Sequence, residues 1–159
     1  MGTLIAYATK YGCTETCAKM LASQLSETPE VVNLKKLSKV DLTKYNNVII
    51  GGSIYMGRIQ KKVKKFCLEN METLKNKRIG LFICGMSPQD VTDKLLSDAF
   101  PSELTSMAVA KDTFGGAFNF ERMNFIERFI IKKISKVEKS TSNISEVAIH
   151  KFAAVMNNR

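Results

Sequence analysis

The chain has 159 residues, of which 45% are hydrophobic and 25% charged, a size and composition typical of one globular domain with one core. We expect a cytoplasmic chain, because no apolar run is long enough to span a bilayer and the N-terminus lacks the pattern of a secretory signal. The formal net charge of +9 favours an acidic ligand, an anionic lipid or nucleic acid as partner, but no nucleic-acid-binding motif is present.

The first predicted element is a buried strand. Residues 3–8 (TLIAYA) form a short apolar run, which suits one parallel strand. Residues 9–14 (TKYGCT) follow as a loop of hydroxyl groups around one glycine, and a helical pattern begins at Glu15. This order directs backbone N–H groups at a phosphate, with a plain helix cap as the alternative. The loop matches neither Gly-x-Gly-x-x-Gly nor the Walker phosphate loop, which argues against a dinucleotide or a nucleoside triphosphate.

Further strands and helices alternate along the rest of the chain. The remaining strands are predicted at residues 30–34, 47–52, 78–84 and 107–110. The last of these extends to residue 118 in the longer alternative. The remaining helices are predicted at residues 59–74, 91–100 and 143–156. Such alternation implies an α/β fold, in which helices cover both faces of a doubly wound parallel sheet of five strands in the order 2-1-3-4-5. A ligand then binds beyond the carboxyl ends of strands 1, 3 and 4, at loops 9–14, 53–57 and 85–90.

The last predicted helix is amphipathic, and Ser142 or Asn143 is its expected cap. Its expected inward side chains are Ile144, Val147, Ala148, Phe152 and Val155. His150, the one histidine, faces solvent in this interpretation and has no predicted catalytic role.

The four cysteines, at positions 13, 17, 67 and 84, include no C-x-x-C pair. Without such a pair or a second histidine the sequence predicts no zinc site, and a reduced chain is the simplest interpretation. Cys13 and Cys17 lie one helical turn apart, where core filling is favoured over redox pairing.

Two of the loops resemble those of flavodoxins. Residues 9–14 resemble the family's phosphate loop at Thr9, Gly12 and Thr14, and residues 51–57 (GGSIYMG) resemble its isoalloxazine loop. The resemblance covers most of the chain and implies a single flavodoxin-like domain, a three-layer sandwich that binds FMN and transfers electrons. It also implies that Tyr55 stacks on the flavin, because a flat apolar ring favours an aromatic partner.

The implied cofactor-binding residues lie in four short segments. They are Thr9, Lys10, Tyr11, Gly12, Cys13, Thr14, Ser53, Ile54, Tyr55, Met56, Gly57, Cys84, Gly85, Met86 and Gly116. The Met56-Gly57 peptide is expected near flavin N5. The third loop departs from the family pattern, since most flavodoxins have a tyrosine there and this chain offers Met86, a soft packing residue.

Residues 114–143 form a basic, aromatic insertion near the fifth strand. Residues 121–139 carry six lysines and arginines against three glutamates, and residues 58–78 carry eight against two, so these two stretches account for the whole excess of charge. One face of the insertion is an apolar stripe of Met123, Ile126, Ile130, Ile134 and Val137. A neighbouring face carries Phe125, Arg128, Phe129 and Lys132. Rings beside cations suit a bilayer surface or a flat apolar ligand with carboxylates, such as a porphyrin; a helix packed on the sheet edge is the structural alternative.

Residues 124–132 (NFIERFIIK) resemble a motif of the flavodoxin-type, quinone-dependent protoporphyrinogen oxidases. The resemblance implies an enzyme of haem biosynthesis that oxidises protoporphyrinogen IX to protoporphyrin IX, with electrons passing through FMN to a membrane quinone. Phe125, Arg128, Phe129 and Lys132 are then the substrate or membrane face, and peripheral contact at the inner face of the membrane is expected. The flavin does the chemistry, so no catalytic side chain and no metal are predicted.

Two other functions stay open at the level of sequence. A plain electron-transfer flavodoxin would have the same loops and a redox-protein partner, but no substrate of its own. A non-enzymatic basic binding module would use the lysines and bind no flavin, with a steep dependence on salt.

Overall fold

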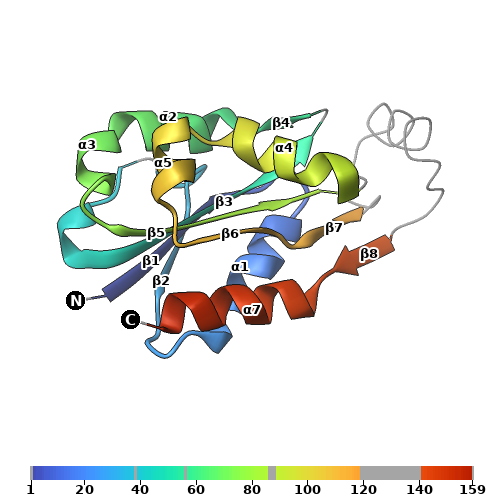
Figure 1. The fold of residues 1–159 in the computed structure, drawn as a ribbon, viewed down its shortest axis with the longest axis horizontal. Coiled ribbons are helices and arrows are strands. Elements are labelled where there is room, and N and C mark those ends of the chain that lie inside the picture. Colours follow the sequence, from blue (N-terminus) through green and yellow to red (C-terminus); the bar gives the residue numbers. More distant parts are fainter. Residues whose placement is uncertain (1, 38, 56, 86–88, 119–140, 159) are drawn as a thin grey trace.

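Five parallel strands form the centre of the computed structural model, which describes residues 2–37, 39–55, 57–85, 89–118 and 141–158 (Figure 1). The strands are β1 (Gly2–Ala8), β2 (Glu30–Asn33), β3 (Tyr45–Tyr55), β5 (Arg78–Cys84) and β6 (Ala110–Thr113). They lie in the order β2-β1-β3-β5-β6, and β4 (Arg58–Ile59) pairs antiparallel with the end of β3. The predicted order of the parallel strands is confirmed.

The central strands are buried on both faces, which explains their continuous apolar runs. Ile5 on β1 lies between Val31 of β2 and Ile49 of β3, and Ile49 in turn pairs with Gly80 of β5. Ile5 and Ile49 are fully buried. β5 coincides with the predicted strand at residues 78–84, an apolar run that lies between Lys77 and Gly85.

Helices cover both faces of the sheet (Figure 1). One layer holds α1 (Cys13–Gln24) and α7 (Glu146–Asn157), and the other holds α2 (Lys61–Glu69), α3 (Met71–Leu74), α4 (Gln89–Ala99) and α5 (Ser102–Met107). A short 3-10 helix, η1 (Leu42–Lys44), leads into β3. Each layer has its own apolar core. Phe82 belongs to the core beneath α1 and α7, where its ring stacks on that of Phe114 with the centroids 4.7 Å apart.

The last helix differs from its prediction. It begins at Glu146, with the Ser145 hydroxyl accepting a hydrogen bond from the Ala148 N–H at 3.1 Å, so neither Ser142 nor Asn143 is the cap. Residues 141–144 instead form β8 (Thr141–Ile144), which pairs antiparallel with β7 (Gly115–Phe118). Val147 and Val155 are 65% and 41% exposed, so the prediction that they point inward was wrong. The buried stripe of α7 consists of Ile149, Phe152, Ala153 and Met156.

Other boundaries differ as well, among them those of β3, which runs over Tyr45–Tyr55 where a strand at residues 47–52 was predicted. The fifth strand begins at Ala110, because the residues after Pro101 form α5, for which the fixed φ of proline suits the position before the first turn. The helix predicted at residues 59–74 is divided at Asn70 into α2 and α3, and its first residue, Ile59, belongs to β4. The first helix begins at Cys13, two residues before the predicted start.

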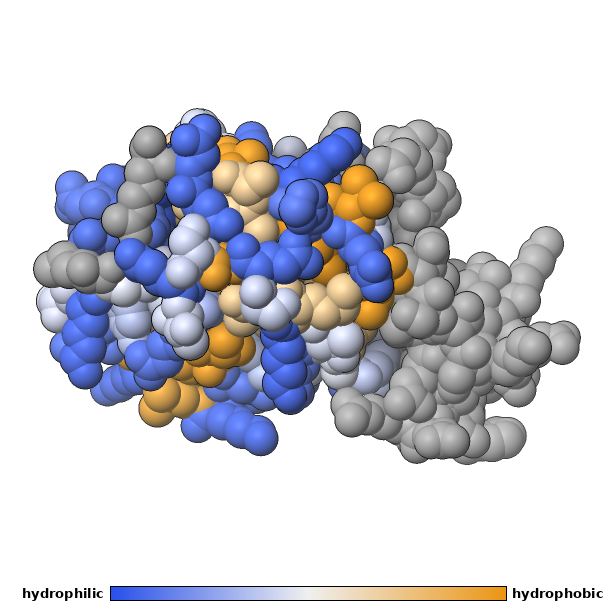
Figure 2. All heavy atoms as spheres, turned by 90° about the horizontal axis from the view of Figure 1, so that it is seen from below, coloured by the Kyte–Doolittle hydropathy of each residue, from blue (hydrophilic) through white to orange (hydrophobic). Residues whose placement is uncertain are grey.

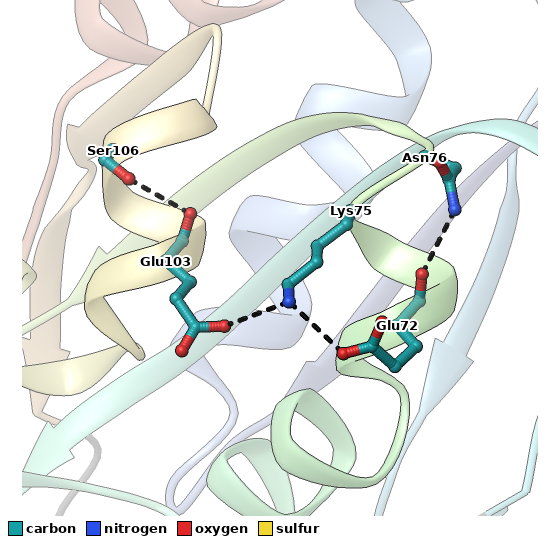
Figure 3. Close-up of polar contacts among 5 residues, drawn as sticks. All are labelled: Glu72, Lys75, Asn76, Glu103 and Ser106. Carbon is teal, nitrogen blue, oxygen red and sulfur yellow. Dashed lines mark hydrogen bonds and ion pairs between the residues drawn. The ribbon is translucent and has the colours of Figure 1, made fainter.

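The amino-terminal end of the sheet carries a polar network that has no part in the candidate site (Figure 3). Lys75, which follows α3, contacts Glu72 at 3.2 Å and Glu103 of α5 at 3.6 Å. These helices precede β5 and β6, so the network lies at the end of the sheet opposite the carboxyl-end loops. Its side chains are 44–90% exposed, and such surface ion pairs contribute little to stability.

The view from below in Figure 2 shows hydrophilic residues interspersed with hydrophobic ones. Scattered apolar residues of this kind are ordinary on protein surfaces. Among the residues that the structure describes, no helix combines the length and the apolar character that crossing a membrane would require.

Candidate functional site

The carboxyl ends of β1, β3 and β5 bring three predicted loops together. The Thr14 and Ser53 hydroxyls, 39 residues apart in sequence, share a hydrogen bond of 2.6 Å that joins the first loop to the second. A Cβ at Gly85 would lie 3.3 Å from the Cβ of Ile54, so the third loop packs closely on the second. The loops therefore form one surface at the edge of the sheet where a ligand of this fold binds.

The first loop has the geometry of an anion site. Gly12 adopts a φ of +95°, which favours glycine, and its N–H donates to the Thr9 hydroxyl at 2.9 Å. α1 begins at the next residue, and no side chain among those described caps it. The first turn therefore directs backbone N–H groups and the positive end of the helix dipole at the loop.

A lysine outside the predicted set contributes to this loop. The Lys35 Nζ donates to the Thr9 carbonyl at 2.6 Å and so places a cation beside the loop. Lys35 follows β2, which is hydrogen-bonded to β1, so the two strand ends are neighbours. The sequence carried one signal for it, namely its position just after the second strand, but nothing local distinguishes it from other surface lysines.

Aromatic side chains gather where the first and second loops meet. The rings of Tyr11 and Tyr55 lie 6.0 Å apart between centroids at an angle of 76°. The Lys10 Nζ lies 4.1 Å from the Tyr55 ring centroid and 5.7 Å from that of Tyr11, within the range of a cation–π contact. A partly exposed aromatic ring and an exposed lysine therefore lie next to the first loop.

The second loop is a tight hairpin. Gly57 turns the chain between β3 and β4 with a φ of +77°, and the Ser53 N–H donates to the Gln60 side-chain oxygen at 2.9 Å. The hairpin fixes Ser53, Ile54 and Tyr55 at the end of β3, all three of them partly exposed. Met56 lies outside the described residues.

The third loop begins at Cys84, which is buried, and Gly85. The Gly85 N–H donates to the Gly115 carbonyl at 2.8 Å, which connects this loop to β7, where Gly116 lies. β7 and β8 lie at the two ends of the predicted insertion and pair with each other, so both ends lie close to the start of the third loop (Figure 1). Met86, Phe125, Arg128, Phe129 and Lys132 lie outside the described residues.

Burial changes the acidity of a tyrosine beneath the first loop. Tyr7, at the end of β1, is 5% exposed. Burial, and then the negative charge of Glu15, raise the pKa of Tyr7 above its ordinary value. The phenol therefore stays neutral at physiological pH and adds no negative charge beneath the first loop.

The sequence missed one cluster in this region. Cys84 lies with Cys13 and Cys17, and all three sulfur atoms are within 4.8 Å of one another. One signal was present in the sequence: Cys84 ends β5, and Cys13 lies a few residues after the end of β1, so both cysteines are near the carboxyl end of a central strand. Spacing along the chain cannot identify such a cluster, since it depends on the order of the strands.

Comparisons of the sequence and of the structure with known proteins point to the same family. A model of the flavodoxin domain family matches residues 4–145. The chain is 24% identical over 158 residues to protoporphyrinogen IX dehydrogenase (quinone) from Escherichia coli strain K12, covering 94% of this chain and 87% of that protein. Oxidised flavodoxin 2 from Bacillus cereus has a similar fold, with a TM-score of 0.61, 14% identity and coverage of 98% of this chain and 97% of that one.

A larger protein contains a similar fold as one part. Rubredoxin oxygen:oxidoreductase from Desulfovibrio gigas matches with a TM-score of 0.54 and 17% identity. The match covers 98% of this chain, which spans 36% of the length of that protein. At this identity the likeness concerns the fold alone.

Proposed function

Because the chain belongs to the flavodoxin domain family, whose model matches residues 4–145, we propose that it is an FMN-binding redox enzyme that oxidises protoporphyrinogen IX to protoporphyrin IX and passes the electrons to a quinone. The observation that carries the proposal is the hydrogen bond between Thr14 and Ser53, which joins a phosphate-type loop to an aromatic loop at the carboxyl edge of the sheet. The similarity to protoporphyrinogen IX dehydrogenase (quinone) from Escherichia coli supports the choice of substrate and acceptor.

The donor groups of the first loop fit a phosphate monoester. The start of α1 supplies backbone N–H groups, Thr9 and Thr14 supply hydroxyls, and Lys35 supplies a cation at its 2.6 Å contact with the Thr9 carbonyl. Charged donors at a helix N-terminus favour a dianion. We therefore assign the FMN phosphate to residues 9–14.

Tyr55 and the residues around it fit the flavin ring. Tyr55 presents an aromatic ring beside the phosphate loop, and Lys10 lies close enough to contact either that ring or a bound anion. When bound, FMN supplies the hydride acceptance and the onward electron transfer. The protein residues hold it in place and limit the access of water to its ring.

The position of the two ends of the insertion supports a role for it in binding the substrate. Its two ends, β7 and β8, pair with each other, and Gly115 is tied to Gly85 of the third loop at 2.8 Å. We propose that Phe125, Arg128, Phe129 and Lys132 of this insertion contact the porphyrinogen or a membrane surface, since rings beside cations suit an apolar ligand with carboxylates. A peripheral position at the membrane would bring the site to its quinone.

The first test is whether the purified protein binds FMN, measured by visible absorption after removal of excess cofactor. We expect retained flavin bands, and then formation of fluorescent protoporphyrin from protoporphyrinogen when a quinone is added without oxygen. A protein that binds FMN but turns over no porphyrinogen with any quinone would contradict the enzyme and favour an electron carrier. A protein that binds no FMN would contradict the whole proposal.

Variants separate the enzyme from the carrier. The Phe125→Ala/Phe129→Ala double variant should keep FMN and lose porphyrinogen oxidation, because only the proposed substrate face is altered. Leu68→Ala is the matched control, an apolar truncation at a 66% exposed position on α2, and it should keep both. Oxidation that is unchanged in the double variant would refute the role of the insertion.

A further inference from the structure

Three buried cysteines lie together beneath the first and third loops. Cys13 and Cys17 occupy one face of the first turns of α1, and Cys84 is the last residue of β5. Their exposed fractions are 9%, 0% and 1%, none of the three forms a disulfide, and their sulfur atoms all lie within 4.8 Å of one another.

The surroundings of the cluster are apolar. The three cysteines belong to the core layer beneath α1 and α7, together with Ile49 and Phe82. An ion held there must leave little net charge, because an uncompensated charge in an apolar layer is costly.

The thiols of Cys17 and Cys84 are protonated at neutral pH. Hydrogen bonding with Cys13 is the largest cause that raises the pKa of Cys17, and the same interaction, followed by that with Cys17 and by burial, raises the pKa of Cys84. Protonated thiols are poor nucleophiles, which argues against ready oxidation to a disulfide. A ligand for this site must therefore displace protons by forming strong bonds to sulfur.

The apolar surroundings and the three sulfur ligands together determine which charge a bound ion should have. Three thiolates around a monovalent or divalent ion would leave a net negative charge in the apolar layer, whereas three thiolates around a trivalent centre leave none. Soft sulfur ligands favour thiophilic centres, and trivalent arsenic takes three sulfur ligands.

We propose that Cys13, Cys17 and Cys84 form a three-sulfur binding site for trivalent arsenic, taken up from arsenite. Arsenous acid exchanges its three hydroxyl groups for the three sulfurs. Three As–S bonds form, three As–O and three S–H bonds break, and each thiol proton leaves with a hydroxyl group as water. The oxidation state of arsenic does not change, so no oxidant or reductant is required.

The structure also provides an entry point. Cys13, the most exposed of the three, directly follows Gly12 at the surface loop, so the first exchange can occur there and the two buried thiols can follow. Once bound, the arsenic would link the start of α1 to the end of β5.

The test uses the intact folded chain, incubated with arsenite and a phosphine reductant that does not compete for arsenic. Native mass spectrometry should show one arsenic per chain with the loss of three protons, and near-ultraviolet absorption from As–S bonds should rise to saturation. Failure of the folded chain to bind arsenic, or an adduct that has lost only two protons, would overturn the proposal. This proton count is made on the unaltered chain, so it stands even where a variant fails to fold.

Variants identify the sulfurs. Cys17→Ala and Cys84→Ala, each checked for folding by circular dichroism, should lose the three-proton adduct. Cys67→Ala is the matched control, since Cys67 is equally buried but lies in the core layer on the other face of the sheet, and it should bind as the unaltered chain does. A three-proton adduct that survives in either of the first two variants would overturn the assignment. The readouts do not involve the flavin, so they test this site independently of the proposed function.

Discussion

The hydrogen bond between Thr14 and Ser53 offers a direct test of how the site is held together. Thr14 is fully buried, and its hydroxyl lies 2.6 Å from that of the partly exposed Ser53. Thr14→Val keeps the shape of the side chain and removes the hydroxyl. A neutral hydrogen bond contributes about 1 kcal/mol net, so we expect the free energy of unfolding to fall by about that amount.

The same substitution should weaken FMN binding. A lost contact between this hydroxyl and the phosphate should reduce the binding free energy of FMN by about 1.4 kcal/mol, which corresponds to a dissociation constant about tenfold higher. The assay is fluorescence titration of FMN with Thr14→Val, Ser53→Ala and the double variant. Thr16→Val is the matched control, because Thr16 lies on the same helix and its exposed hydroxyl donates only to the Gly12 carbonyl at 3.1 Å.

The double-mutant cycle separates the free energy of the Thr14–Ser53 interaction from the other effects of each single substitution. We expect a coupling free energy of about 1 kcal/mol between Thr14 and Ser53 in unfolding, and less than that between Thr16 and Ser53. The reasoning would be refuted by strictly additive effects of Thr14→Val and Ser53→Ala, or by an FMN affinity that falls equally in Thr16→Val.

Two further predictions concern the scaffold. Gly51→Ala should destabilise the fold by about 3 kcal/mol or more in urea unfolding, because a Cβ there would overlap the buried ring of Phe82. Gly57→Ala, with open space but a φ of +77°, should cost only about 1–2 kcal/mol, and an equal loss in the two variants would contradict the packing argument. Hydrogen bonding to Glu30, followed by burial, raises the pKa of Tyr45 to about 12, against an ordinary value of 10.0. The stabilisation is therefore complete below about pH 10 and is lost as the pH rises towards 12, so unfolding free energies should fall more steeply over that range than in Tyr45→Phe; parallel pH profiles would show that this hydrogen bond is absent.

Local patterns in the sequence determined the strands and the chemistry of the loops. The apolar run of β5 lies between Lys77 and Gly85, so its bounds could be predicted to the residue. Thr9, Gly12 and Thr14 follow β1 directly, and their residue types alone indicated a phosphate-binding turn. Both depend on residues that are neighbours in the chain, where backbone preferences and side-chain alternation act.

Contacts between distant segments required the tertiary structure. Three such contacts depend on which strands lie side by side. They are the hydrogen bond between Thr14 and Ser53, the hydrogen bond from Lys35 to the Thr9 carbonyl, and the cluster of Cys84 with Cys13 and Cys17. The exposure of Val147 likewise follows from where α7 packs, which its own periodicity did not fix. Sequence patterns report the preferences of one segment at a time, whereas these contacts arise from the burial of several segments against one another, and only the folded sheet sets their relative positions.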